Sequence, residues 1–383
     1  MKRLFWGLAL ALLFITHTDA HAEGIGATVP ALKTLFHDDF LMGTALNSTH
    51  FSEDEGLLKT STDEREIVNK HFDSITPENS LKWGSVHPKP DTYVFDEADR
   101  YVNFGHKRGM FIIGHTLVWH SQAPAWIFQD QEGTLLTKDA LLARMKDHIQ
   151  TVVGRYRGKI HGWDVVNEAL ADDGSLRDSL WLKIIGEDYI VKAFEFAQEA
   201  DPSAELYYND YGLEEARKRE GALKLLKKLQ AVGVKITGVG MQGHYGIDYP
   251  KMSEIENTIR SFATLNLKVM ITELDVNVLP TPGNGGADIS INFKPDAQWN
   301  PYVKGLPMKE EERLAQRYAE LFALFLQYRK DISRVTFWGV SDSGSWLNDF
   351  PVHGRTNYPL LFDRNCQAKP AFTAVAKLRQ SVD

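Results

Sequence analysis

Short apolar runs alternate with longer amphipathic segments along this 383-residue chain, and no other feature limits its fold as strongly. Apolar, largely β-branched and aromatic runs predict strands at Phe40–Ala45, Phe72–Thr76, Phe111–Trp119, Ile160–Asn167, Glu205–Asn209, Ile236–Gln242, Lys268–Glu273 and Arg334–Val340. Helical periodicity predicts helices at Asp63–His71, Asp96–Arg108, Lys138–Tyr156, Leu180–Ala200, Glu214–Ala231, Met252–Leu265, Lys309–Tyr328 and Ala371–Leu378.

A strand followed by a helix, repeated eight times, indicates a single (β/α)₈ TIM barrel, which we expect to occupy residues 23–383 as one domain. A doubly wound open sheet is the alternative. It is less favoured because no Gly-rich phosphate turn follows the first strand. The connection from Pro280 to Pro307 is long and rich in Gly, Asn, Asp and Pro, and a loop of that length is usually functional or disordered.

The N-terminus has the features of a secretory signal peptide. Lys2 and Arg3 precede the apolar run Leu4–Ile15, and Ala20 and Ala22 supply the small residues of a cleavage site. We therefore expect residues 1–22 to be removed and the protein to be secreted or periplasmic. A membrane anchor is the alternative, but so short a run seldom spans a bilayer, and we expect no stable membrane insertion after the signal is removed.

Charge and cysteine content narrow the classes of partner. The net charge of −8 and the isoelectric point near 5.9 argue against a nucleic-acid partner or an anionic membrane surface. The lone cysteine, Cys366, leaves the chain without an internal disulfide, and no base pattern marks it as a nucleophile. We expect a monomer.

Two of the predicted strands end abruptly in a glutamate. Glu168 closes the run that begins at Gly162, and Glu273 closes the run that begins at Val269. The C-terminal ends of barrel strands converge on one face, where barrel enzymes hold their catalytic groups. One such glutamate alone would usually be a surface ion-pair partner. Two carboxylates at two strand ends are the minimum set for cleaving a glycosidic bond.

The other predicted strand ends carry carboxylates, amides, imidazoles and indoles, which suit the hydroxyls and the apolar ring faces of a sugar. The candidate substrate contacts are Glu78, Asn79, Lys82, His115, Trp119, Gln122, Asn167, Asn209, Tyr211, Gln242, His244, Trp338 and Trp346, and Asp275 belongs to the same set of strand-end residues. Trp338 and Trp346 have core packing as their alternative. For Trp346, the polar residues before it favour an exposed loop.

The alternative interpretation of the strand-end histidines is that they bind a metal ion. His115, His120 and His244 come from two different strands, and the spacing of the first two lacks the helical geometry of zinc proteases. We expect neither a metal nor a cofactor.

Three segments, Gly114–His120, Asp164–Glu168 and Ile271–Asp275, closely resemble the motifs of glycoside hydrolase family ten. The resemblance extends from Gly43 to Asp363. It implies a retaining endo-β-1,4-xylanase that binds xylan and xylo-oligosaccharides. A retaining β-1,4-glucanase on the same barrel is the alternative, and a catalytically inactive carbohydrate-binding barrel is a further one.

The resemblance also implies a role for each strand-end residue. Glu168 becomes the general acid/base and Glu273 the nucleophile, with His244 bonded to Glu273 and oriented by Asp275. Subsite roles follow for the remaining residues: Asn167, Lys82, His115, Gln242 and Trp338 at the sugar under attack; Glu78, Asn79, Gln122 and Trp346 at the next glycone subsite; and Asn209 and Tyr211 on the aglycone side. The sequence leaves open whether Phe350 forms a wall of the distal subsite or packs under its loop.

Overall fold

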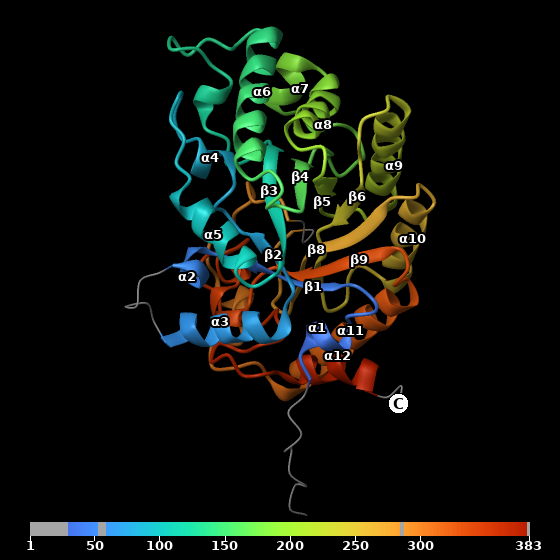
Figure 1. The fold of residues 1–383 in the computed structure, drawn as a ribbon. Coiled ribbons are helices and arrows are strands. Elements are labelled where there is room, and N and C mark those ends of the chain that lie inside the picture. The colour runs from blue at the N-terminus through green and yellow to red at the C-terminus, as the bar shows by residue number, and fades with distance from the viewer. Residues whose placement is uncertain (1–29, 53–58, 284–286, 381–383) are drawn as a thin grey trace, which may run out of the picture. The chain divides into compact units, whose positions relative to one another are not determined.

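The structure is a computed structural model that describes residues 30–52, 59–283 and 287–380 (Figure 1). From Ala31 onward the described residues form one compact unit. The predicted signal peptide, residues 1–22, lies outside the described part of the chain, so its boundary stays a prediction. Within the described part, no helix combines the length and the apolarity needed to cross a membrane.

Eight parallel strands close into a barrel within the described residues. They are β1 (Leu41–Leu46), β2 (Ser74–Pro77), β3 (Phe111–Trp119), β4 (Gly162–Asn167), β5 (Glu205–Asp210), β6 (Gly238–Met241), β8 (Lys268–Asn277) and β9 (Ile332–Phe337). The pairings of β1 with β9 and of β6 with β8 complete the ring. The predicted (β/α)₈ barrel is confirmed, because the strands of an open sheet would end in unpaired edges.

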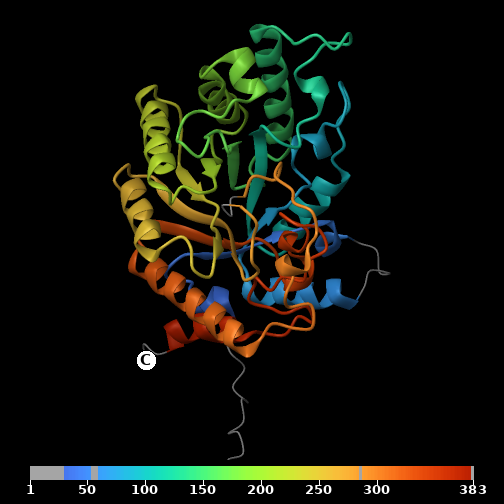
Figure 2. The same ribbon diagram turned by 180° about the vertical axis from the view of Figure 1, so that it is seen from behind.

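Helices surround the strands, as the two opposite views show (Figures 1 and 2). The longer helices are α3 (Lys59–His71), α5 (Asp96–His106), α6 (Lys138–Arg155), α7 (Leu180–Ile185), α8 (Asp188–Ala200), α9 (Ala216–Ala231), α10 (Met252–Ala263), α11 (Met308–Gln327) and α12 (Pro370–Gln380), and single turns form α1 (Leu32–Leu35), α2 (Ser48–Phe51) and α4 (Trp83–Val86). The prediction of one helix over Leu180–Ala200 is wrong. The chain breaks at Gly186, whose φ of 88° lies in the left-handed region that ends helices.

Large side chains fill the interior of the barrel and are matched by glycines on neighbouring strands. Trp163 of β4 is fully buried, and a Cβ on Gly114 of β3 would lie 2.1 Å from its ring. Tyr207 of β5 takes the same position against Gly162, at 2.5 Å. This packing closes the centre of the barrel, so polar strand-end residues are held on a rigid base.

A short extra strand, β7 (His244–Gly246), explains why β8 runs four residues beyond its predicted end at Glu273. It pairs in parallel with the last part of β8, with His244 opposite Asp275. The register places the imidazole of His244 between two carboxylates of β8. The connection from β8 to α11 then pairs Phe293 with Val352 before it reaches the single turn η2 (Ala297–Trp299). Figure 2 shows this orange connection lying over the centre of the barrel.

Candidate active site

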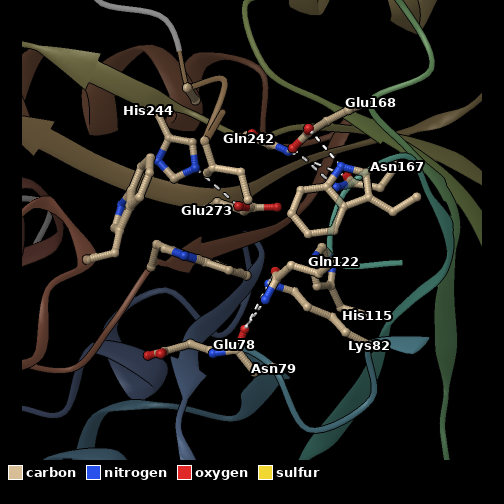
Figure 3. A pocket seen from close by; sticks show the side chains of 15 residues that line it. Glu78, Asn79, Lys82, His115, Gln122, Asn167, Glu168, Gln242, His244 and Glu273 are labelled. Atoms are coloured by element: carbon tan, nitrogen blue, oxygen red, sulfur yellow. Dashed lines mark hydrogen bonds and ion pairs between the residues drawn. The ribbon is translucent and has the colours of Figure 1, made fainter. Parts of the chain in front are cut away.

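One cavity of about 130 Å³ gathers nearly all the strand-end residues predicted from the sequence (Figure 3). Its lining consists of Glu78, Asn79, Lys82, His115, Trp119, Gln122, Asn167, Glu168, Gln242, His244, Glu273, Ala287, Ile289, Trp338 and Trp346. Each barrel strand from β2 onward, except β5, supplies lining residues either from the strand or from the segment that follows it. These residues meet because parallel strands bring their C-terminal ends to the same face of the barrel.

Glu168 sits just beyond β4 in a left-handed conformation, with φ of 55°. Its carboxylate accepts hydrogen bonds from Trp119 Nε1 at 2.8 Å, Gln242 Nε2 at 3.0 Å and Asn167 Nδ2 at 3.2 Å. Burial raises the pKa of Glu168 to about 7, and the negative charges of Asp210 and Glu273 act in the same direction against these hydrogen bonds. The group is therefore substantially protonated near neutral pH.

Glu273 has the opposite preference. Burial pushes its pKa up, but the hydrogen bond to His244, the charges of His115 and His244 and the hydrogen bond from Asn209 outweigh burial and hold the pKa below its usual value. Asn209 Nδ2 lies 2.8 Å from Oε1, and His244 Nε2 lies 3.1 Å from Oε2. Figure 3 shows His244 and Glu273 turned toward one another. Glu273 is thus held as a carboxylate.

His244 is the cation that stabilises this charge. Burial lowers its pKa, but the charge of Asp275 and the contacts with both carboxylates raise it to about 10. Nδ1 lies 3.1 Å from Asp275 Oδ1, while the other carboxylate oxygen of Asp275 accepts a 2.7 Å hydrogen bond from Trp346 Nε1. The ring of Trp346 stacks on Phe350 with centroids 4.6 Å apart. Phe350 does not line this cavity, but it lines an adjoining hollow that shares His244, Ala287 and Trp346 with it, so its role at the distal subsite stays a prediction.

A second polar cluster forms the opposite side of the cavity. Lys82 Nζ donates to Gln122 Oε1 at 2.8 Å and to Asn79 Oδ1 at 3.0 Å, and it lies 4.9 Å from the centroid of the Trp119 ring. Burial lowers the pKa of Lys82, although nearby carboxylates counteract this. Glu78 beside it has a pKa raised by burial. These groups present donors and acceptors to a ligand whose ring lies along Trp119.

His115 is fixed by a partner that sequence reasoning missed. Its Nδ1 lies 2.9 Å from Asp164 Oδ2, and its ring meets Trp338 edge-on at 5.5 Å. The signal for Asp164 was present, since a charged residue inside the apolar run of β4 needs a partner when buried. The described residues contain no group of three His, Cys, Asp or Glu side chains arranged to hold a metal ion.

The predicted aglycone role of Asn209 is not supported. Asn209 is fully buried, donates to both Glu273 and Asn167, and accepts a 2.6 Å hydrogen bond from Thr272. Without exposed surface it has no way to contact a sugar, so it positions the nucleophile candidate instead. Tyr211, two residues further on, lines a neighbouring groove of about 660 Å³ together with Glu214, Lys218, Tyr245 and Tyr249.

Three further functional candidates were not identified individually from the sequence, although the length of the Pro280–Pro307 connection was a signal for two of them. Ala287 and Ile289 belong to the long connection after β8, yet both line the cavity. Ala287 also lines the groove that contains Tyr211 and His244, so it marks the place where cavity and groove meet. Arg177, in the segment after β4, donates to the backbone carbonyl of Glu168 at 3.1 Å.

A carboxylic acid and a carboxylate that line one cavity, with amides and indoles around them, can perform acid-assisted cleavage of a glycosidic bond. The profile of glycosyl hydrolase family 10 matches residues 31–378. An endo-1,4-beta-xylanase A of Xylanibacter ruminicola is 47% identical over 351 residues, which cover 91% of this chain and 93% of the relative. A beta-1,4-xylanase of Dictyoglomus thermophilum is 44% identical over 372 residues, 97% of each chain.

The fold agrees with this likeness. A GH10 endoxylanase retrieved from sugarcane soil metagenome superposes with a TM-score of 0.86 at 44% identity, over 91% of this chain and 99% of that structure. The chain therefore belongs to glycosyl hydrolase family 10.

Proposed function

We propose that this protein is a retaining endo-1,4-β-xylanase that cleaves internal xylosidic bonds of xylan by double displacement. The observation that carries the proposal is the opposite protonation of Glu168 and Glu273 within one cavity. A retaining glycosidase needs one carboxylic acid to protonate the leaving oxygen and one carboxylate to attack the anomeric carbon. The family and the xylanases among its relatives support the choice of reaction and substrate.

In the first step, a carboxylate oxygen of Glu273 bonds to the anomeric carbon while the bond to the leaving oxygen breaks. Glu168 gives its proton to that oxygen. His244 and Asn209 hold the attacking carboxylate and keep it ionised until it reacts. This first step leaves a glycosyl ester on Glu273 and a carboxylate on Glu168.

In the second step, Glu168 takes a proton from water as the water oxygen attacks the anomeric carbon from the side that the leaving group vacated. The ester bond to Glu273 breaks, and the sugar is released with its original configuration. The exchange of roles has a physical basis in the structure. Glu273 loses its charge when the ester forms, which removes one cause of the raised pKa of Glu168 and allows it to act as a base.

Substrate contacts follow from the two sides of the cavity. All of the following residues line the cavity. From the family resemblance we assign Asn167, Lys82, His115, Gln242 and Trp338 to the sugar under attack, and Glu78, Asn79, Gln122 and Trp346 to the next glycone subsite. The indoles of Trp338 and Trp346 close over the ring edge, where glucose would carry a hydroxymethyl group and xylose carries hydrogen. Rejection of one such group is worth about 1–3 kcal/mol, so weak activity on aryl glucosides is expected. The glucanase alternative is not favoured by the xylanase relatives.

The decisive experiment is product analysis on xylohexaose, with the anomer of the fresh reducing end followed by NMR and soluble cellulose as the competing substrate. Internal cleavage with an initial β-anomer supports the proposal. An initial α-anomer, release of single xylose units alone, or faster cleavage of cellulose would overturn it. Glu273→Ala serves as the inactive control.

We further propose that the enzyme is exported and acts as a monomer. Residues 1–22 carry the charged, apolar and small-residue segments of a signal peptide. N-terminal sequencing of protein from the periplasm and from the culture medium tests the first point, and Glu23 is the expected first residue. Light scattering of the purified protein tests the second, against a chain mass of 43.3 kDa before processing.

A further inference from the structure

The two strands that carry the catalytic carboxylates are also joined above the cleft. The segment after β4 contains Arg177, and the connection after β8 contains residues 287–290, which we call the strap. Ala287 lines both the catalytic cavity and the neighbouring groove, and Ile289 lines the cavity. The strap therefore lies where a sugar chain would pass from one to the other. His244, which contacts Glu273, also lines both the cavity and the groove, so this place lies beside the nucleophile candidate.

The strap is fastened by an ion pair. Asp288 Oδ2 lies 3.1 Å from Arg177 Nη1, with the two side chains only 22% and 16% exposed. The second oxygen of Asp288 accepts hydrogen bonds from the backbone N–H and the hydroxyl of Ser290, at 3.0 and 2.6 Å. This local bonding fixes the rotamer of Asp288, so the carboxylate is aimed at Arg177 before the pair forms.

Arg177 is in turn fixed on the opposite wall. Its Nε donates to the backbone carbonyl of Glu168 at 3.1 Å, and its Nη2 donates to the hydroxyl of Tyr211 at 2.7 Å. The guanidinium of Arg177 thus contacts the backbone of Glu168, the hydroxyl of Tyr211 in the groove and Asp288 in the strap. On the other side, the backbone N–H of Phe293 donates to Pro351 O at 2.8 Å, which attaches the chain beyond the strap to the loop that carries Trp346.

We propose that Asp288 is a specificity-determining residue, which holds the strap against Arg177 and so favours short, unbranched xylo-oligosaccharides over polymeric xylan. The inference rests on the proposed xylanase function. A short chain has a free end close to the bond that is cleaved, and it enters lengthwise beneath the strap. The middle of a long chain has no free end nearby, so it enters sideways, and it does so only while the Asp288–Arg177 pair is open.

The position of the strap also predicts which substrates are cleaved most slowly. Side groups on xylan widen the chain, and they meet the strap at the junction of cavity and groove even when the chain enters lengthwise. Decorated polymer is therefore the poorest substrate, linear polymer intermediate and xylo-oligosaccharide the best. Asp288 makes no hydrogen bond to either catalytic carboxylate and reaches Glu168 only through Arg177, which contacts the backbone carbonyl of Glu168, so we expect its removal to act mainly on access.

The test is the ratio of kcat/KM on arabinose-decorated polymeric xylan to kcat/KM on xylohexaose. Asp288→Asn removes the charge at nearly constant shape, and it should raise this ratio about fivefold, the upper end of what a pair of this exposure contributes. Asp288→Glu keeps the charge and should retain most of the wild-type ratio. Asp296→Asn is the matched control, because Asp296 lies in the same connection and caps η2 without reaching Arg177. Its ratio should equal that of the wild type.

An unchanged ratio in Asp288→Asn, or an equal change on both substrates, would overturn the proposal. Thermal melting shows whether the variant folds. If it does not, Ser290→Ala, which removes the hydroxyl that orients Asp288, should raise the ratio in the same direction, and no rise there overturns the proposal as well. Failure of the proposed function is separately visible in the wild type, which would then give an initial α-anomer or only single xylose units from xylohexaose, or would cleave cellulose faster.

Discussion

Loss of the amide at position 209 should change the pH dependence of catalysis and not merely its rate. Asn209 Nδ2 lies 2.8 Å from Glu273 Oε1, and Asn209 itself is fully buried. A hydrogen bond to a charged group contributes about 1.5–3 kcal/mol, and one pKa unit corresponds to about 1.4 kcal/mol. Asn209→Ala should therefore raise the pKa of Glu273 by about 1–2 units.

The direction in which the pH profile shifts follows from the role of Glu273. The nucleophile reacts as a carboxylate, so the acidic limb of the kcat/KM profile reports its pKa in the free enzyme. That limb should move to higher pH, toward an alkaline limb set near 7 by Glu168. The bell-shaped profile therefore becomes narrower, its maximum moves to higher pH, and its peak rate falls. Asn209→Asp, which replaces the donor with a second carboxyl group, should move the acidic limb further than Asn209→Ala does.

Hydrolysis of 4-nitrophenyl β-xylobioside between about pH 3 and 9 measures both limbs. Thr272→Val is the matched control, because Thr272 donates to Asn209 Oδ1 at 2.6 Å and makes no bond to Glu273. It should move the acidic limb by less than half as much. If Asn209→Ala lowers kcat while both limbs keep their wild-type positions, Asn209 acts through packing alone and the electrostatic argument is refuted.

Three other outcomes are expected. Glu273→Ala should lose nearly all turnover on xylan and on aryl xylosides, and azide should restore product of inverted configuration; a residual rate above a few per cent of wild type would contradict the assignment. Glu168→Ala should remove the alkaline limb near pH 7. It should also lower KM together with kcat for a dinitrophenyl glycoside, because deglycosylation becomes rate-limiting. Equal slowing of the glycosylation step for good and poor leaving groups would contradict the acid/base role of Glu168. Burial and the charges of Lys70 and Lys33 lower the pKa of His71 to about 4 in the folded protein. As the pH falls, His71 therefore takes up its proton first in the unfolded state, and the free energy of unfolding decreases between about pH 6.5 and about pH 4. Urea unfolding of His71→Gln should show that loss reduced by up to about 3 kcal/mol, and an identical pH dependence in the variant would exclude His71.

The fold and most of the cavity were predictable because both depend on one rule. The carboxyl ends of parallel barrel strands meet on one face, so polar residues found there in the sequence are neighbours in space. Glu168, Glu273, His115 and Trp346 were found in this way, although they are far apart along the chain. The rule needs the position of a strand end and nothing about the packing around it.

What the sequence did not reveal depends on side-chain direction and on distant contacts. Asn209 and Tyr211 are two residues apart, yet Asn209 is bonded inside the barrel and Tyr211 lines the outer groove. The rule for strand ends assigns both to the same surface. The sequence left two roles open for Phe350, and it did not reveal that the ring of Phe350 stacks on Trp346. The approach of Asp288 to Arg177 joins residues 111 positions apart, and no local pattern records it.

The indole N–H of Trp346 has a consequence for how mutations on its side of the cleft are interpreted. It donates to Asp275, which faces His244, which faces Glu273. The stacking of one sugar on the Trp346 ring is therefore thermodynamically linked to the ionisation of Glu273, which attacks the neighbouring sugar. Because linkage is reciprocal, a change at Trp346 alters both affinity and reactivity, and a shift in KM there is not a pure measure of stacking.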